Sequence, residues 1–327
     1  MQEDSVIDFT RARFPAYADG GFAVEPLEKG GSGRRFYRIS VEGGPSLIAV
    51  KYSTERPENV RYAEIAKFLD RCGVRVPHVL LHDADEGLMW MEDLGEEDLW
   101  SFRNEDWSVR HPLYVQALRE VHRLHTAASA EFSRHPLTVE LEFDEPLYLW
   151  EQHYFFDHCL GGVFGLSEAE RRRYAELPRF AEMARHLASL PRVLVHRDFQ
   201  SQNVMIRDGE ACLIDFQGMR PGLAAYDVAS LLYDPYVPLT DPERATLLQD
   251  YRSMGGCDDD FEETFHLCAL QRLMQAMGAY GFLGLTKGRT DFLSHVPAAR
   301  ENLRVVASRV DGLDAFVKIL SDLSAVV

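Results

Sequence analysis

The sequence predicts an α+β fold of two lobes, a small β-rich N-terminal lobe and a larger helical C-terminal lobe. Short β-rich runs separated by Gly-containing turns fill the first third of the 327 residues. After Gly95 the apolar residues recur at helical spacing, and one β-rich stretch, residues 192–216, interrupts the helices. We therefore expect the lobes to comprise residues 1–95 and 96–327.

The composition is that of an ordinary globular protein, 46% hydrophobic and 27% charged. With 35 basic against 52 acidic residues the net charge is −17, which disfavours nucleic acid and anionic membranes as partners. The five cysteines show no CxxC spacing, and the acidic N-terminus does not resemble a signal peptide. We expect a cytoplasmic protein with reduced thiols; the sequence carries no signal of oligomeric state.

The first lobe is expected to contain five strands and one helix. Pro57 suits the first turn of a helix that runs to about Cys72 and ends at Gly73. Tyr62 and Leu69 belong to its apolar stripe. The strands are expected at residues 23–27, 35–41, 47–52, 79–82 and 88–92.

The second lobe is expected to be mostly helical, because apolar residues recur there every three to four positions. The expected helices cover residues 112–125, 146–160, 167–190, 225–233, 241–254, 258–283 and 297–310.

The β-rich stretch reads VLVHRDFQSQNVMIRDGEACLIDFQ, and its geometry can be derived from one turn. Asp208-Gly209 between two apolar runs predicts a two-residue hairpin turn, so paired residues have numbers that add to 417. Asn203 then lies opposite Ile214, and Asp215 lies at the same end of the hairpin, beside the loop that carries Asp198.

This cluster of oxygen-bearing side chains suits phosphoryl transfer. Mg²⁺ prefers carboxylate, amide and phosphate oxygens, so Asn203 and Asp215 are candidate metal ligands. Asp198 is the candidate catalytic base that accepts the proton of the attacking hydroxyl. The alternative is an acidic hairpin end that only faces water, but the spacing of H-R-D, Asn and D-F favours the catalytic interpretation.

The segments HRDFQSQN and IDFQ resemble the catalytic and metal-binding loops of the aminoglycoside phosphotransferase and choline kinase superfamily, whose members are relatives of protein kinases. The resemblance implies a two-lobed protein-kinase-like fold that uses ATP and Mg²⁺. Gln217 stands where protein kinases have the Gly of D-F-G, and no A-P-E segment follows, so the resemblance implies a small-molecule acceptor. It also implies that Asp227 braces the catalytic loop.

Lys51 shares one face of its strand with Leu47 and Ala49, where a charged group needs a partner unless it reaches into water. The resemblance implies that Lys51 holds the α- and β-phosphates of ATP. A glutamate on the following helix should pair with it. Helical spacing with the apolar stripe favours Glu58, and Glu64 remains the alternative.

Two further segments are candidates for nucleotide binding. In GGSGRR, Gly31, Ser32 and Gly33 allow backbone amides to approach phosphates, although such a segment can also be a simple turn. Arg34 and Arg35 either contact phosphate or face water.

The run LMWMEDLG would lead into the hinge between the lobes. There the carbonyl of Met91 and the amide of Asp93 would bind the adenine edge. The alternative is a buried strand with an acidic turn.

Several stretches resemble the bacterial N-acetylmuramate/N-acetylglucosamine anomeric kinases, among them GGSGRRFYRI, PENVRYAEIAKFL and QRLMQAMGAYGFLGLTKGR. This resemblance supports Glu58 and implies transfer of the γ-phosphate of ATP to the C1 hydroxyl of an amino sugar. Gln200-Ser201-Gln202 departs from that branch. Aromatic residues that would form either a sugar-binding wall or helix core are Tyr148, Trp150, His153, Tyr154 and Phe155.

Two other functions remain open. One is a kinase of another hydroxylated metabolite, such as an aminoglycoside or a choline-like amine, with the acidic residues 257–263 binding the cation. The other is a non-catalytic nucleotide-binding module, which the presence of Lys51, Asp198, Asn203 and Asp215 disfavours.

Overall fold

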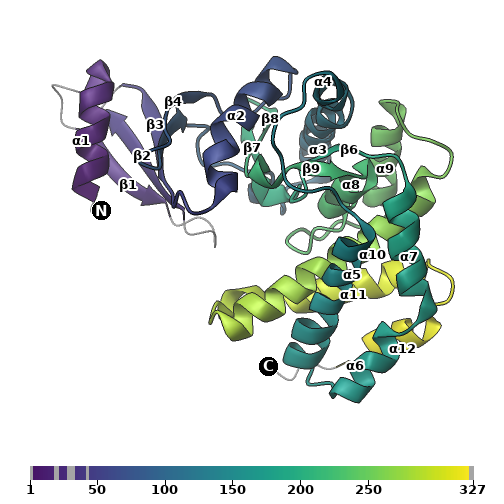
Figure 1. Ribbon diagram of the computed structural model, residues 1–327. Helices are drawn as coiled ribbons and strands as arrows, with labels where there is room; N and C mark the ends of the chain where they lie inside the picture. Colours follow the sequence, from purple (N-terminus) through teal and green to yellow (C-terminus); the bar gives the residue numbers. More distant parts are fainter. Residues whose placement is uncertain (1–2, 18–21, 28–33, 42–43, 324–327) are drawn as a thin grey trace.

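The computed structural model describes residues 3–17, 22–27, 34–41 and 44–323, and it confirms the α+β fold with two lobes. The first lobe holds an antiparallel five-stranded sheet of order β1-β2-β3-β5-β4 (Figure 1). The strands are β1 (Phe22–Leu27), β2 (Arg35–Val41), β3 (Ser46–Lys51), β4 (Val79–Asp83) and β5 (Leu88–Glu92), each within one residue of the predicted bounds.

Helix α2 (Pro57–Arg71) forms as predicted and covers one face of the sheet. Its Tyr62 and Leu69 lie in a buried cluster with Ile48 and Val50 of β3. The helix ends before Gly73, whose φ of +76° is the left-handed conformation that glycine adopts readily at a helix end.

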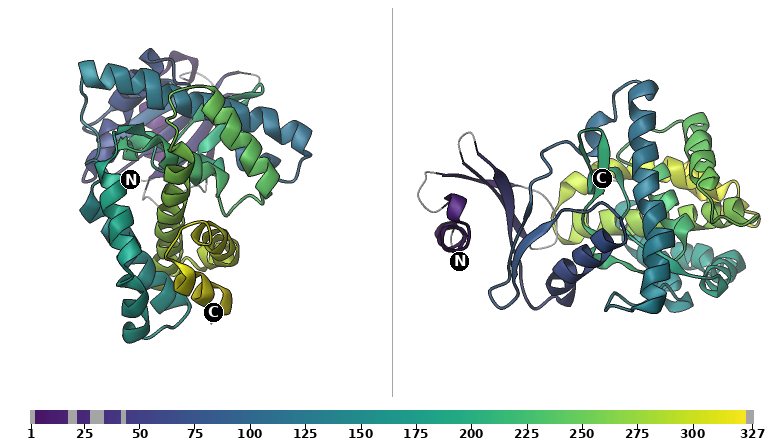
Figure 2. Two further views of the ribbon diagram at one scale, coloured as in Figure 1. Left: turned by 90° about the vertical axis from the view of Figure 1, so that its right-hand side faces the viewer. Right: turned by 90° about the horizontal axis from the view of Figure 1, so that it is seen from above.

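The opposite face of the sheet is covered by α1 (Glu3–Arg13), a helix that the sequence analysis did not predict. Val6 packs there against Leu47 and Ala49 of β3. The indole Nε1 of Trp90 donates a hydrogen bond of 2.9 Å to Thr10 Oγ1 and ties α1 to β5. Figure 2 shows α1 on the outer side of the sheet, away from the helical lobe.

The second lobe is helical, as predicted, around the long buried helix α10 (Phe261–Gly281). The predicted helix at 167–190 is in fact two, α6 (Glu168–Ala175) and α7 (Pro178–Ser189), because Pro178 begins a new helix after the extended Leu177. The other predicted helices are α3 (Trp107–Arg123), α5 (Glu145–Tyr154), α8 (Ala224–Leu232), α9 (Asp241–Ser253) and α11 (Val296–Ala307). Two more were not predicted, α4 (Ser129–Arg134) and α12 (Asp314–Asp322).

Two small antiparallel pairs interrupt the helices: β6 (Val193–Val195) with β9 (Arg220–Gly222), and β7 (Val204–Arg207) with β8 (Glu210–Leu213). The β7–β8 register is the predicted one, since Val204 pairs with Leu213. Asp208 and Gly209 both have positive φ, 55° and 77°, as a type I′ hairpin turn requires.

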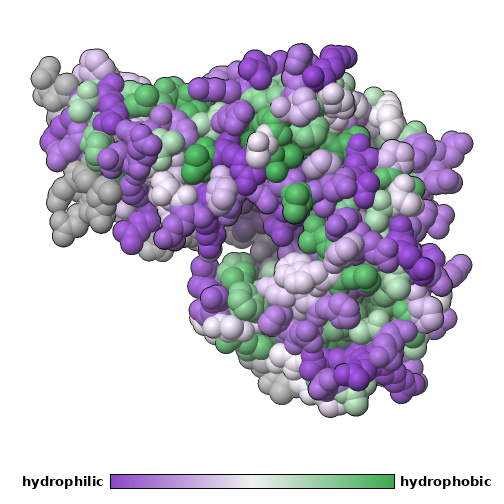
Figure 3. Space-filling model, viewed as in Figure 1, coloured by the Kyte–Doolittle hydropathy of each residue, from purple (hydrophilic) through white to green (hydrophobic). Residues whose placement is uncertain are grey.

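The lobes meet along a connection after β5, where the amide of Ile206 donates a 2.8 Å hydrogen bond to the carbonyl of Glu97. Figure 3 shows the surface hollowed where the sheet-bearing lobe meets the helical lobe. A domain boundary at residue 95 remains a prediction. No helix within the described ranges has the length and apolar character needed to span a bilayer.

Candidate active site

The β7–β8 hairpin brings the ends of three functional segments together. The carbonyl of Asn203 accepts a 3.0 Å hydrogen bond from the amide of Ile214, the residue before Asp215. The side-chain amide of Asn203 donates a 2.9 Å bond to the carbonyl of Asp198. Asn203 therefore connects the loop that carries the candidate base to the residue that precedes the candidate metal ligand.

Asp215 lies at a left-handed backbone position with φ of 63°. Its Oδ1 accepts a 3.0 Å hydrogen bond from Gln217 Nε2. The Oε1 of Gln217 is buried and has no hydrogen-bond partner among the described residues. Asp215, Gln217 and Asn203 thus offer carboxylate and amide oxygens, the donors that Mg²⁺ prefers.

No group of three or more His, Cys, Asp or Glu side chains in the described part of the chain is arranged to hold a metal. Such a cluster is not required for Mg²⁺ beside a nucleotide, because the ion takes one or two protein carboxylates and completes its shell with phosphates and water.

Asp198 lies between two guanidinium groups. Its Oδ2 accepts from Arg197 Nη1, and its Oδ1 lies 3.6 Å from Arg272 Nη2 on α10. Burial alone would raise the pKa of Asp198, but the two arginines outweigh it and hold the pKa below its ordinary value. The side chain is 26% exposed, so an ionised carboxylate remains accessible to a substrate.

Asp227 braces the loop that carries Asp198, as the family resemblance implied. Its buried carboxylate accepts hydrogen bonds from the amides of His196 (2.6 Å) and Arg197 (2.8 Å). His125 Nε2 lies 2.9 Å from Asp227 Oδ2 on the same carboxylate. These bonds stabilise the left-handed backbone of Arg197, whose φ is 78°.

Asp234 supports the next part of the same loop. It is 2% exposed and accepts hydrogen bonds from Ser201 N at 2.8 Å and Ser201 Oγ at 2.5 Å. In the structure Ser201, part of the segment that departs from the amino-sugar kinases, is therefore a buried loop support.

The predicted pairing of Lys51 with a helix glutamate is not formed in this structure. Lys51 lies on the sheet face of Leu47 and Ala49, which α1 covers, whereas α2 packs on the other face. Lys51 Nζ instead donates to the carbonyl of Glu86. Neither Glu58 nor Glu64 contacts it within the described residues, and the phosphate-binding roles of Lys51 and Glu58 remain predictions.

Gly31, Ser32 and Gly33 lie outside the described residues. Arg34, which follows them, forms an ion pair with Asp215 Oδ1 and has a side chain that is only 9% exposed. Arg35 is exposed. The sequence alone did not separate the two arginines.

The predicted hinge is an ordered connection. Met91 lies inside β5 and is 7% exposed. The Asp93 carboxylate accepts from Arg38 Nε at 2.8 Å and from the Gly95 amide at 3.0 Å. Arg207 Nη1 donates a 3.0 Å bond to the Asp93 carbonyl.

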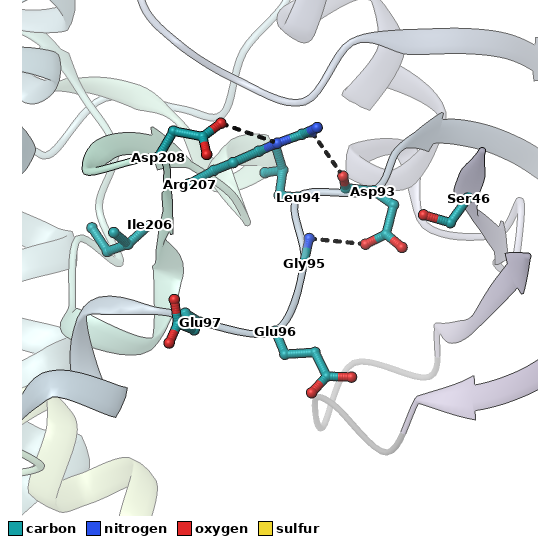
Figure 4. Close-up of a pocket in the computed structure, with 9 residues that line it drawn as sticks. All are labelled: Ser46, Asp93, Leu94, Gly95, Glu96, Glu97, Ile206, Arg207 and Asp208. Atoms are coloured by element: carbon teal, nitrogen blue, oxygen red, sulfur yellow. Dashed lines mark hydrogen bonds and ion pairs between the residues drawn. The ribbon is translucent and has the colours of Figure 1, made fainter. Parts of the chain in front are cut away.

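Figure 4 shows a pocket beside this hinge, with Arg207 reaching across from the hairpin. Four carboxylates line it, those of Asp93, Glu96, Glu97 and Asp208. Such a lining repels a triphosphate, and no candidate phosphate or metal ligand lies in it. Adenine binding by Met91 and Asp93 remains a prediction.

The aromatic residues of α5 and Phe155, which follows it, divide between the core and the surface. Tyr148 and Phe155 are buried, whereas Trp150 is 53% exposed and stacks on Tyr154 with centroids 4.9 Å apart. Helix α10 approaches closely at Gly278, where a Cβ would lie 2.7 Å from Tyr154 Cδ1. Trp150 and Tyr154 therefore remain candidates for a sugar-binding wall.

Sequence reasoning missed Arg272, although a signal existed. It is the one Lys or Arg between Phe261 and Gly281, in the mostly apolar part of the helix, and a buried cation requires partners. The structure provides them in Ser230 Oγ at 3.0 Å, Gln275 Oε1 and Asp198.

A candidate base on a loop braced by a buried carboxylate, next to a hairpin that ends in carboxylate and amide oxygens, is the arrangement expected of a kinase-like phosphotransferase. The model of the phosphotransferase enzyme family matches residues 23–263, and the chain belongs to this family. It is a small-molecule kinase.

Known relatives and structures agree with this assignment. The N-acetylmuramate/N-acetylglucosamine kinase of Neisseria meningitidis is 25% identical over 300 residues, covering 89% of this chain and 87% of the relative. That of Pseudomonas aeruginosa is 26% identical, covering 91% and 88%.

Among solved structures, a choline/ethanolamine kinase family protein of Mesorhizobium loti has a TM-score of 0.65 at 15% identity, covering 98% of this chain and 99% of the other. An ADP-bound aminoglycoside phosphotransferase has a TM-score of 0.61 at 14% identity, covering 91% and 97%. At these identities the structures show the fold.

Replacing Arg272 should change the pH dependence of catalysis. Arg272→Gln removes a cation that lowers the pKa of Asp198, so the pKa should rise and the acidic limb of kcat/KM should move to higher pH. Arg272→Lys keeps the charge and should leave the limb near its wild-type position. An unchanged limb in the glutamine variant would show that Arg272 does not tune the base.

Proposed function

We propose that this protein transfers the γ-phosphate of ATP to the C1 hydroxyl of an amino sugar, N-acetylglucosamine or N-acetylmuramate. The observation that carries the choice of acceptor is the pair of guanidiniums, Arg197 and Arg272, on either side of Asp198. A cationic group would be repelled next to this base, whereas a neutral or anionic sugar would not.

The same observation argues against aminoglycosides and choline-like amines. The acidic residues 257–263, the candidate cation-binding segment, lie at the start of α10, and residues Asp258 to Asp260 are exposed. Arg272 lies about 16 Å further along that helix than Phe261. The acidic segment is thus remote from the base. The names of the curated relatives also support an amino-sugar acceptor.

In the proposed reaction the acceptor oxygen forms a bond to the γ-phosphorus while the bond from phosphorus to the bridging oxygen of ATP breaks. Asp198 accepts the proton of the attacking hydroxyl. The C1 hydroxyl of a reducing sugar is more acidic than an ordinary alcohol, so a carboxylate of low pKa suffices. Arg197 and Arg272 keep that carboxylate ionised.

Asn203 and Asp215 would hold Mg²⁺, which when bound neutralises charge on the phosphates. Gln217 fixes the Asp215 carboxylate through its side-chain amide. Asp227 holds the loop backbone just before the base and Asp234 holds it just after, so that this backbone need not rearrange during the reaction.

A substrate panel tests the acceptor. With ATP and Mg²⁺, free N-acetylglucosamine or N-acetylmuramate should be phosphorylated, and the methyl glycoside, whose C1 oxygen is blocked, should be inert. An aminoglycoside and choline should react at least about 100-fold more slowly, because discrimination against a like charge at the base exceeds ~3 kcal/mol. A methyl glycoside that reacts as fast as the free sugar would place the reaction at another hydroxyl.

A further inference from the structure

Arg34 lies on the face of the sheet that looks toward the helical lobe. Its guanidinium is 5.6 Å from the ring centre of Phe36, and Phe36 packs against the main core cluster that includes α2. Its Nη2 contacts Asp215 Oδ1 across the space between the lobes. Lys51, by contrast, lies on the face that α1 covers.

The ion pair places a cation on a candidate metal ligand. Mg²⁺ and a guanidinium compete for the same carboxylate oxygen, so binding of a Mg²⁺–nucleotide would displace Arg34 from Asp215. The displaced side chain could then bind the phosphates of the nucleotide. A guanidinium presents several N–H donors in a fixed plane that matches phosphate oxygens.

Resting on the proposed function, we infer that Arg34 is a phosphate-binding residue that Asp215 holds in position before the nucleotide arrives. When the Mg²⁺–nucleotide enters, Asp215 binds the metal and Arg34 binds the β- or γ-phosphate. The exchange keeps both charges paired before and after binding.

A single variant should weaken nucleotide binding and strengthen binding of the metal alone. Arg34→Ala should weaken binding of Mg²⁺ with a non-hydrolysable ATP analogue by about 10- to 100-fold, the scale of a charged hydrogen bond. The same variant should bind Mn²⁺ alone about two- to fivefold more tightly, because Asp215 no longer has a competing cation. A residue that merely stabilised the fold would not tighten metal binding.

Both affinities can be measured by calorimetry for the nucleotide and by paramagnetic resonance for Mn²⁺. Arg35→Ala is the matched control, since Arg35 is adjacent but exposed, and it should bind both ligands within about twofold of wild type. Arg34→Gln retains bulk and hydrogen bonding without charge, and it repeats the test should the alanine variant fold poorly.

The possible results separate this inference from the proposed function. Wild-type affinity of Arg34→Ala for the Mg²⁺–nucleotide, or weaker Mn²⁺ binding in both Arg34 variants, would overturn the inference alone. If the wild-type chain bound no nucleotide, the proposed function itself would fail.

Discussion

Asp198→Asn should lower kcat by about 10²-fold or more while leaving ATP affinity close to wild type. An asparagine of the same size keeps the loop geometry but cannot accept the proton of the attacking hydroxyl. The carboxylate is well suited to that role, because Arg197 and Arg272 keep its pKa low. Steady-state kinetics with the sugar that the wild type phosphorylates measure kcat, and an ATP titration measures the affinity.

The hairpin offers a matched control for this variant. Asp208, at the β7–β8 turn, has a side chain that is 90% exposed, and Asp208→Asn suits its positive φ. It should turn over like the wild type. Near-wild-type kcat in Asp198→Asn would remove Asp198 from the mechanism, whereas loss of ATP affinity would indicate a damaged loop.

Asp215→Ala should abolish the Mg²⁺-dependent part of ATP binding. Asp215 is the carboxylate at the end of the hairpin, and the amide oxygens of Asn203 and Gln217 cannot replace its charge. Calorimetric titrations with and without Mg²⁺ measure the effect, and the metal-free titration should change little.

A second variant separates the metal from the backbone. Because Asp215 has a φ of 63°, alanine is strained there, while Asp215→Asn tolerates that conformation. Both variants should lose the metal-dependent affinity. Unchanged Mg²⁺–ATP affinity in the asparagine variant would exclude Asp215 as a metal ligand.

The parts of the fold that sequence predicted well depend on local rules. The Asp208-Gly209 turn fixes the register of its hairpin. The position of Asn203 opposite Ile214, and of Asp215 at the same end of the hairpin, could therefore be derived without a structure. Helix α2 was equally readable, because Pro57 and Gly73 mark its ends.

The parts that sequence missed depend on tertiary packing. Helix α1 has few apolar residues and forms against Trp90, far away in the chain, so its periodicity alone gave no signal. Without α1, the side of the sheet that Lys51 faces could not be chosen, and the predicted contact with a glutamate of α2 is not formed. Likewise, Arg272 and Asp198 are far apart in the sequence, and only the packing of α10 brings their side chains together.

The central claim is phosphoryl transfer to C1 of an amino sugar, and one spectrum tests it most directly. The protein is incubated with ATP, Mg²⁺ and N-acetylglucosamine labelled with ¹³C at C1, or N-acetylmuramate labelled likewise, and the product is examined by ³¹P NMR. We predict a new phosphorus signal split by coupling to the labelled carbon. A phosphorylated sugar whose phosphorus shows no two-bond ³¹P–¹³C coupling to C1, or the absence of any phosphorylated sugar, would contradict the account.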